Sequence, residues 1–127
     1  MLSANELDMG VAQARNLSAA MLDRLRLDRA RLEGMAKDLE AVAQLADPVG
    51  AIESLREMES AVRAGRMTLP LGVIAMIYES RPNVTSDAAA LCLKSGNACV
   101  LRGGKEAFHS SQAIARLFED ALEAEGL

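Results

Sequence analysis

The order of apolar runs and polar loops between Pro70 and Ala107 is the feature that most limits the fold of this chain. The run at 72–78, GVIAMIY, is continuously apolar and contains Val and Ile, which is typical of a strand buried on both faces of a sheet. A polar loop at 79–83, a helix, a second strand at 98–101 and a glycine loop at 102–106 follow. Because a helix joins the two strands, we predict that they are parallel and that the connection is right-handed.

Both polar loops follow directly on the carboxyl ends of the predicted strands. Ligands of parallel α/β sheets bind outside these ends, so Glu79–Asn83 and Arg102–Glu106 are predicted to face a ligand. We expect the helix between the strands to begin at Thr85–Asp87 and to end at Gly96-Asn97, and a last helix to run from about His109 to Glu125. The second half of the chain is thus predicted to be a β-α-β-α unit.

The first 48 residues are predicted to be helical. Apolar residues recur every three or four positions within residues 5–14, 18–27 and 28–46, and Asp47-Pro48 ends the third helix. The expected N-caps are Asn5, Ser18 and Asp28. We interpret these helices as scaffold, because no group of chemically active side chains is evident in them.

Residues 49–70 form the segment whose structure the sequence defines least. Ser54 followed by Glu57 is compatible with a helical capping box, and the apolar spacing around this pair is roughly helical. Gly65 interrupts that spacing. We therefore expect an irregular chain to about Ser60 and then an extended strand to the end of the segment.

The composition argues against several classes of function. Hydrophobic residues make up 50% and charged residues 25% of the 127 residues, a balance typical of one globular domain. A formal net charge of -4 and 2% aromatic residues provide neither the basic surface nor the stacking platforms of a nucleic-acid-binding protein. No apolar run reaches the length of a membrane span, and residues 1–10 lack the basic start of a signal peptide. We expect a cytoplasmic protein without a nucleic-acid or membrane partner.

The chain contains two cysteines, Cys92 and Cys99, and one histidine, His109. The cysteines do not form a CxxC pair, and we predict no metal site. We interpret both cysteines as reduced, buried and structural, because disulfides are rare in cytosolic proteins. His109 is interpreted as part of the start of the last helix.

Two parallel strands that are apolar on both faces do not make a stable sheet by themselves. An edge and a face stay open unless further strands and helices cover them, or unless copies of the chain associate through them. We therefore expect the sequence to be a piece of a larger α/β protein.

Residues 70–84 (PLGVIAMIYESRPNV) and 87–107 (DAAALCLKSGNACVLRGGKEA) resemble the gamma-glutamyl phosphate reductase family of the aldehyde dehydrogenase superfamily. Residues 17–25 and 45–50 are similar to the same family, whereas residues 53–68 match it least. The three motifs PLGVI, YESRPN and LCLKSGNA..LRGGKEA, in this order and spacing, make the resemblance specific.

The resemblance implies an aldehyde dehydrogenase-like α/β fold that is incomplete in this chain. Residues 1–48 correspond to an N-terminal helical segment, and residues 49–70 to a linker and strand toward an oligomerisation arm. Residues 71–127 correspond to part of a Rossmann-like, NADP-binding domain with a parallel sheet.

The activity implied by the resemblance is an oxidoreductase step of proline biosynthesis. NADPH reduces L-glutamyl 5-phosphate to L-glutamate 5-semialdehyde, and phosphate is released. The catalytic cysteine of the family lies downstream of the part that this chain resembles, so we expect no nucleophile in these residues and no activity from the chain alone. Members of the family self-associate, and we expect a homo-oligomer at full length.

The glycine loop is the coenzyme site that the resemblance implies. Arg102 takes the position that contacts the adenosine ribose, and its planar guanidinium suits the 2′-phosphate of NADP(H). Gly103 and Gly104 allow the backbone to approach the coenzyme, and Lys105 adds positive charge toward a phosphate. From the residues alone, a plain turn with surface charges stays open for this loop.

The loop after the first strand corresponds to the superfamily loop that carries an oxyanion-hole asparagine. Counting from the strand start puts Arg81 at that position, and counting by residue type puts Asn83 there. We interpret Asn83 as the oxyanion donor and Arg81 as a contact to a carboxylate or phosphate of glutamyl phosphate. The alternative, that both side chains merely order the loop before the helix, stays open.

Two other functions also stay open. The chain is compatible with the reductase domain of a bifunctional pyrroline-5-carboxylate synthase. It is also compatible with a nucleotide-binding module without catalysis, although open sheet edges argue against that unless the module oligomerises through them.

Overall fold

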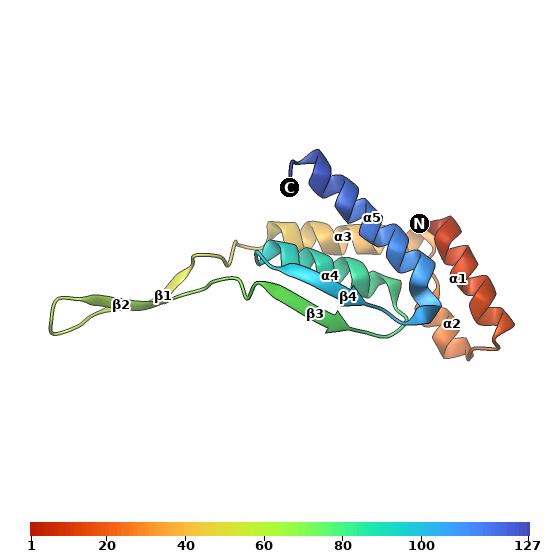
Figure 1. Ribbon diagram of the computed structural model, residues 1–127, viewed down its shortest axis with the longest axis horizontal. Helices are drawn as coiled ribbons and strands as arrows, with labels where there is room; N and C mark the ends of the chain where they lie inside the picture. Colours follow the sequence, from red (N-terminus) through yellow and green to blue (C-terminus); the bar gives the residue numbers. More distant parts are fainter.

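The computed structural model describes all residues from Met1 to Leu127 as a helical body from which one long hairpin projects (Figure 1). The elements are α1 (Leu2–Ala14), α2 (Ala19–Leu25), α3 (Arg29–Gln44), β1 (Ile52–Glu57), β2 (Arg63–Met67), β3 (Val73–Ile77), α4 (Pro82–Lys94), β4 (Ala98–Arg102), the short 3-10 helix η1 (Lys105–Ala107) and α5 (Phe108–Ala124). No helix in it is both long and apolar enough to cross a membrane.

Two of the three expected helix caps in the N-terminal segment are present. The hydroxyl of Ser18 accepts a hydrogen bond from the backbone of Met21, and Asp28 accepts one from the backbone of Arg31. The expectation that Asn5 caps the first helix is wrong, because α1 begins at Leu2 and Asn5 lies inside it. Asn5 is 2% exposed. Its side chain instead donates a hydrogen bond to the backbone oxygen of Leu25 and accepts one from the backbone N–H of Leu27, in the α2–α3 connection.

Strands β1 and β2 form an antiparallel hairpin in which Ile52 lies opposite Met67 and Glu57 lies opposite Arg63. The predicted strand before Pro70 is thus present, but the expectation of an irregular chain up to Ser60 is wrong. The hairpin projects from the body (Figure 1), and nearly all of its residues are exposed. Because neither face is buried, the sequence carries no apolar alternation that would have indicated the first strand.

The second half of the chain is the predicted β-α-β-α unit. Strands β3 and β4 pair in parallel, from Val73 opposite Ala98 to Ile77 opposite Arg102. Helix α4 crosses between them and ends at a left-handed Gly96 with φ +70°, as the glycine there predicts. The last helix, α5, is likewise followed by a left-handed glycine, Gly126, with φ +78°.

One face of the β3–β4 sheet is covered, and the other is open. Cys99 and Leu101 of β4 point toward α4 and α5, which lie on the same side of the sheet (Figure 1). On the opposite face Val73, Ile77 and Val100 are 67%, 83% and 61% exposed. Both faces of this sheet carry apolar side chains, as predicted, but within this chain only one face is covered.

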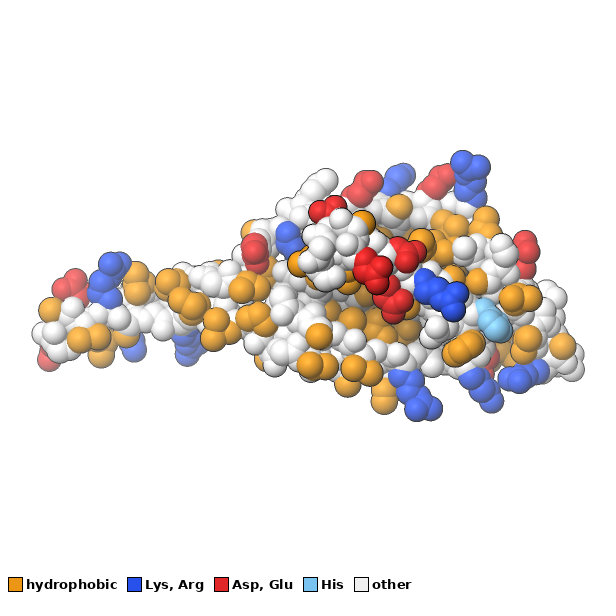
Figure 2. Space-filling model, turned by 45° about the horizontal axis from the view of Figure 1, so that its top comes forward, with side chains coloured by type: hydrophobic (Ala, Val, Ile, Leu, Met, Phe, Trp, Pro, Cys, Tyr) orange, Lys and Arg blue, Asp and Glu red, His pale blue; other side chains and the backbone are white.

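The core of the body is small and divided into two clusters. One consists of Ala12, Leu25 and Ala107, and the other of Leu27, Met35 and Ile114. Many large apolar side chains remain at the surface of the hairpin and the body (Figure 2). The buried polar residues are Asn5, Asp8, Thr85, Ser86 and Ser110. Burial of such polar groups requires hydrogen-bond partners, and none of their buried side-chain atoms lacks one.

Candidate functional site

The two polar loops at the carboxyl ends of β3 and β4 are in direct contact. Ser80, in the loop after β3, donates a hydrogen bond to Glu106 Oε2 at 2.8 Å. The same hydrogen bond is the main reason that the pKa of Glu106 lies below its ordinary value, with help from its own backbone N–H and from Lys105 and Arg15. The structure thus brings both predicted ligand loops to one edge of the sheet.

A hollow of about 260 Å³ lies beside the glycine loop, between that loop and the starts of α4 and α5. Its lining residues are Tyr78, Thr85, Leu101, Arg102, Gly103, Gly104, Lys105, Phe108, Ser111, Gln112 and Ala115. A chain of hydroxyl groups connects its walls, since Tyr78 and Thr85 share a hydrogen bond of 2.7 Å and Thr85 donates to Ser111 at 3.2 Å. Neither Tyr78 nor Thr85 is a site residue predicted from the sequence, although Tyr78 is the only tyrosine and immediately follows β3.

Arg102 and Lys105 carry the positive charge of this hollow. Arg102 is the last residue of β4 and is exposed, and Lys105 begins η1. Neither side chain has a carboxylate within 4.0 Å, so both cations are available to an anionic ligand. The predicted coenzyme residues therefore lie together at the mouth of one hollow.

Packing within the chain explains why Gly103 and Gly104 of this loop are glycines. A Cβ on Gly103 would lie 3.1 Å from the ring of Tyr78. A Cβ on Gly104 would meet the hydroxyl of Ser80 and would lie 2.9 Å from Glu106 Oε2. A side chain at either position would force Tyr78, Ser80 or Glu106 to shift, so close packing of the loop against the end of β3 favours glycine, which is a different reason from the coenzyme approach expected above.

The loop after β3 is shorter than expected, because α4 begins at Pro82 and not at Thr85–Asp87. Proline is favoured in the first turn of a helix, so the signal for this start was present in the sequence. Arg81 is therefore the N-cap residue and Asn83 lies in the first helical turn. Both side chains are exposed at the start of the helix.

Asn83 uses one amide hydrogen within its own helix. Its Nδ2 donates to Asp87 Oδ2 at 3.2 Å, and Ser86 donates to the backbone oxygen of Asn83 at 2.7 Å. Burial raises the pKa of Asp87, and the hydrogen bond from Asn83 opposes that rise. The carboxylate of Asp38 raises the pKa further, and Ser86 lowers it.

Arg81 and Asn83 line a second hollow of about 360 Å³, which is separate from the one beside the glycine loop. Its lining residues are Asp23, Arg24, Arg26, Leu27, Arg31, Gly34, Met35, Asp38, Arg81 and Asn83. The N-terminal segment, interpreted above as scaffold, thus contributes three of the four arginines of this hollow. The signal was the density of arginine in residues 24–31, RLRLDRAR.

A parallel strand–helix–strand unit with two contacting polar loops at its carboxyl edge places the chain in the class of α/β proteins that bind ligands at the ends of parallel strands. No protein-family model matches the chain. Over all 127 residues it is 56% identical to the gamma-glutamyl phosphate reductase of Geobacter sp. (strain M21) and 55% identical to that of Citrifermentans bemidjiense. The chain spans about 30% of the length of these curated relatives.

Two solved structures of gamma-glutamyl phosphate reductases are similar in fold to this chain over nearly its whole length. The gamma-glutamyl phosphate reductase of Thermotoga maritima matches 97% of the chain with a TM-score of 0.92 and 41% identity, and the match covers 30% of that protein. That of Saccharomyces cerevisiae matches 97% of the chain with a TM-score of 0.90 and 36% identity, and the match covers 31% of it. The resemblance inferred from the motifs and the fold class inferred from the strand order are thereby confirmed.

Proposed function

We propose that this chain forms part of an NADPH-dependent gamma-glutamyl phosphate reductase. That enzyme reduces L-glutamyl 5-phosphate to L-glutamate 5-semialdehyde with release of phosphate, as a cytoplasmic step of proline biosynthesis. The observation that carries the proposal is 56% identity to such a reductase over every residue of the chain, both polar loops included. The contact between the loops supports it, because the two loops that we propose to bind the coenzyme and the acyl group lie together at one sheet edge.

The residues around the glycine loop fit a nicotinamide coenzyme that carries a 2′-phosphate. Arg102 and Lys105 are cations without a partner at the mouth of a hollow of about 260 Å³. A guanidinium binds a phosphate through two parallel hydrogen bonds, so Arg102 is the residue proposed to hold the 2′-phosphate. When bound, the coenzyme supplies the hydride for the reduction.

Arg81 and Asn83 are proposed to act on the acyl group. The Asn83 amide retains one N–H that Asp87 does not use, and an amide N–H stabilises the oxyanion that forms when the acyl carbon is attacked.

Neither cysteine of the chain is suited to attack the acyl carbon. Cys92 is 4% exposed, and burial together with the neighbouring Cys92 raises the pKa of the Cys99 thiol. The nucleophilic cysteine is proposed to lie outside these residues.

Self-association is proposed for the β1–β2 hairpin. Its strands are exposed on both faces and each has an unpaired edge, which is the kind of surface that pairs with a second copy. The partners that we propose for the protein are thus a small-molecule substrate and a second copy of the protein itself.

The coenzyme assignment is tested by Arg102→Ala in the natural protein that contains this sequence. Loss of a charged hydrogen-bond pair should raise the KM for NADPH about tenfold or more, because such a pair contributes at least about 1.5 kcal/mol. The KM for NADH should change little, since NADH has no 2′-phosphate. Arg116→Ala, an exposed arginine on α5 outside the hollow, is the matched control. Equal effects of Arg102→Ala on both coenzymes would refute the 2′-phosphate assignment.

A further inference from the structure

The hollow that contains Arg81 is lined by four arginines from four parts of the chain. Arg24 belongs to α2, Arg26 to the α2–α3 connection, Arg31 to α3 and Arg81 to the start of α4. Against these four guanidinium groups, the lining contains two carboxylates, Asp23 and Asp38. The hollow is therefore locally positive in a chain whose net charge is -4.

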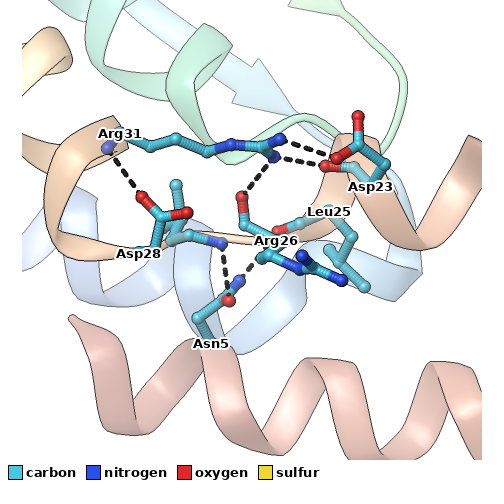
Figure 3. Close-up of polar contacts among 7 residues, drawn as sticks. Asn5, Asp23, Leu25, Arg26, Asp28 and Arg31 are labelled. Atoms are coloured by element: carbon cyan, nitrogen blue, oxygen red, sulfur yellow. Dashed lines mark hydrogen bonds and ion pairs between the residues drawn. The ribbon is translucent and has the colours of Figure 1, made fainter.

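Two of the four arginines are already neutralised by carboxylates. Arg31 donates to Asp23 Oδ1 at 2.7 Å, to the backbone oxygen of Arg26 at 2.9 Å and to the backbone oxygen of Asp23 (Figure 3). Arg24 forms an ion pair with Glu79 at 3.3 Å. Arg31 thus holds the α2–α3 connection in shape, and Arg24 ties α2 to the loop after β3.

The other two arginines have no such partner. Neither Arg26 nor Arg81 has a carboxylate within 4.0 Å. Asp38 also lines the hollow without an ion pair, and Asp87 accepts a hydrogen bond from Asn83, another residue of the lining. Two guanidinium groups and one carboxylate without ion-pair partners leave the concavity with an excess of positive charge, which an anion placed between the two arginines would balance.

The position of Arg26 is fixed by the fold. Leu25 and Leu27, its neighbours, are 0% and 8% exposed, and Asn5 bonds the backbone oxygen of Leu25 and the backbone N–H of Leu27, each at 2.8 Å (Figure 3). The backbone of Arg26 is therefore clamped on both sides, and its side chain is left at the surface. A clamped backbone reduces the entropy lost when the side chain binds a ligand.

We propose that Arg26 and Arg81 together bind one oxyanion group of the substrate, either the phosphate or the carboxylate of an acyl phosphate. The proposal rests on the reductase function proposed above and adds the α2–α3 connection to the substrate site. Arg81 stands at the carboxyl end of β3, where ligands of such sheets bind, and α4 begins there without a side-chain cap on its first N–H groups. The helix start adds to the positive potential of the two guanidinium groups.

This site is distinct from the proposed coenzyme site. None of the residues that line the arginine hollow also lines the hollow beside the glycine loop. Two anion-binding regions at one edge are what a reaction between a phosphorylated coenzyme and an acyl phosphate requires.

The test is a calorimetric titration of the natural protein that contains this sequence with inorganic phosphate and, separately, with glutarate. Every variant also carries Arg102→Ala, which removes the unpaired arginine of the other hollow. Arg26→Gln and Arg81→Gln should each weaken binding of one of the two probes about tenfold or more, the amount expected for a charged hydrogen-bond pair. Arg29→Gln is the matched control, because Arg29 begins α3, pairs with Glu33 and lies outside the hollow.

Kinetics of the reverse reaction, in a background with Arg102 intact, identify which end of the substrate is bound. In this direction semialdehyde, phosphate and NADP⁺ give the acyl phosphate, NADPH and a proton. A higher KM for phosphate in Arg26→Gln assigns the site to the phosphate, and a higher KM for the semialdehyde assigns it to the carboxylate. If neither probe binds more weakly to Arg26→Gln and Arg81→Gln than to Arg29→Gln, the proposal is overturned. A protein without reductase activity would refute the proposed function, while the titrations would still decide whether the anion site exists.

Discussion

The carboxylate of Asp8 accepts hydrogen bonds from both the backbone N–H and the hydroxyl of Ser110, each at 2.7 Å. A third bond comes from the backbone N–H of His109 at 3.1 Å. Helix α5 has no side-chain cap of its own, so a residue of α1 provides the cap for a helix more than 100 residues later. Since α5 directly follows the glycine loop, α1 fixes the far end of that loop.

We predict that Asp8→Ala lowers the free energy of unfolding by about 2–4 kcal/mol, because it leaves buried N–H and hydroxyl groups at the start of α5 without an acceptor. Asp8 is 3% exposed, so these donors lie out of reach of bulk water in the folded protein. Chemical denaturation of the natural protein measures the change. The control is Glu6→Ala, an exposed carboxylate of the same helix, for which a change within about 0.5 kcal/mol is expected. Equal stability of the two variants would show that Asp8 is not a cap.

Ser80→Ala is predicted to raise the pKa of Glu106 toward its ordinary value of 4.5, since the hydrogen bond from Ser80 is the largest cause of its low pKa. A depressed pKa means that this carboxylate stabilises the fold above pH 4.5 and that the contribution is lost as pH falls through the folded-state pKa. Ser80→Ala should therefore make the acid dependence of stability shallower. An NMR titration of the Glu106 carboxyl carbon measures the pKa directly.

The control for Ser80→Ala is Ser3→Ala, which replaces an exposed serine on α1. It should leave the titration of Glu106 unchanged. If Ser80→Ala also leaves it unchanged, the two loops are not linked through this hydrogen bond, and the contact between the predicted coenzyme and acyl regions would need another origin.

The parallel unit was predictable because its residues carry local signals. The apolar run at 72–78, the glycine after α4 and the polar loops after each strand are each visible within a few neighbouring residues. The hairpin was half missed, because strands exposed on both faces have no alternation of apolar and polar residues.

The polar contacts that position the site were not predictable from local patterns. Asp8 and Ser110 are 102 residues apart, and Ser80 and Glu106 are 26 apart, so only the folded chain brings each pair together. The residue type of Asn5 predicts a cap, whereas burial between α1 and the α2–α3 connection decides its role. Three of the four arginines of the hollow stand close together in residues 24–31, but only the fold brings Arg81 to them.

Asn83→Ala is predicted to raise the pKa of Asp87 further above its ordinary value of 3.8, because burial already raises it and the Asn83 amide opposes that rise. A raised carboxyl pKa means that the folded state holds the proton more tightly than the unfolded state. Stability therefore falls as pH rises from 3.8 through the folded-state pKa, and Asn83→Ala should widen that interval. Carboxyl NMR titration measures the shift, with the exposed Gln13→Ala on α1 as the control.

A second variant separates this effect from unfolding. Asp87→Asn has no titrating group at this position, so the part of the pH dependence that Asp87 contributes in that interval should disappear while the helix persists. If the pKa of Asp87 in Asn83→Ala equals that in Gln13→Ala, the Asn83 amide is not committed to Asp87, and both of its N–H groups are open to a ligand.

Ala61→Gly is predicted to stabilise the β1–β2 hairpin by about 0.5–1 kcal/mol. Ala61 has φ +61° in the hairpin turn, a left-handed conformation that costs a residue with a Cβ about 1–2 kcal/mol, whereas the greater flexibility of glycine when unfolded offsets part of the gain. Because an isolated two-stranded hairpin opens independently of the body, the measurement is native-state hydrogen exchange of the Met58 N–H, which donates to the Val62 oxygen at 2.8 Å. This exchange should slow about two- to fivefold, the factor that corresponds to the added stability.

Gly65→Ala is the opposing control, because its Cβ would lie 3.2 Å from the backbone oxygen of Glu53 and should speed exchange. Unchanged exchange in Ala61→Gly would mean that the turn does not limit the stability of the hairpin.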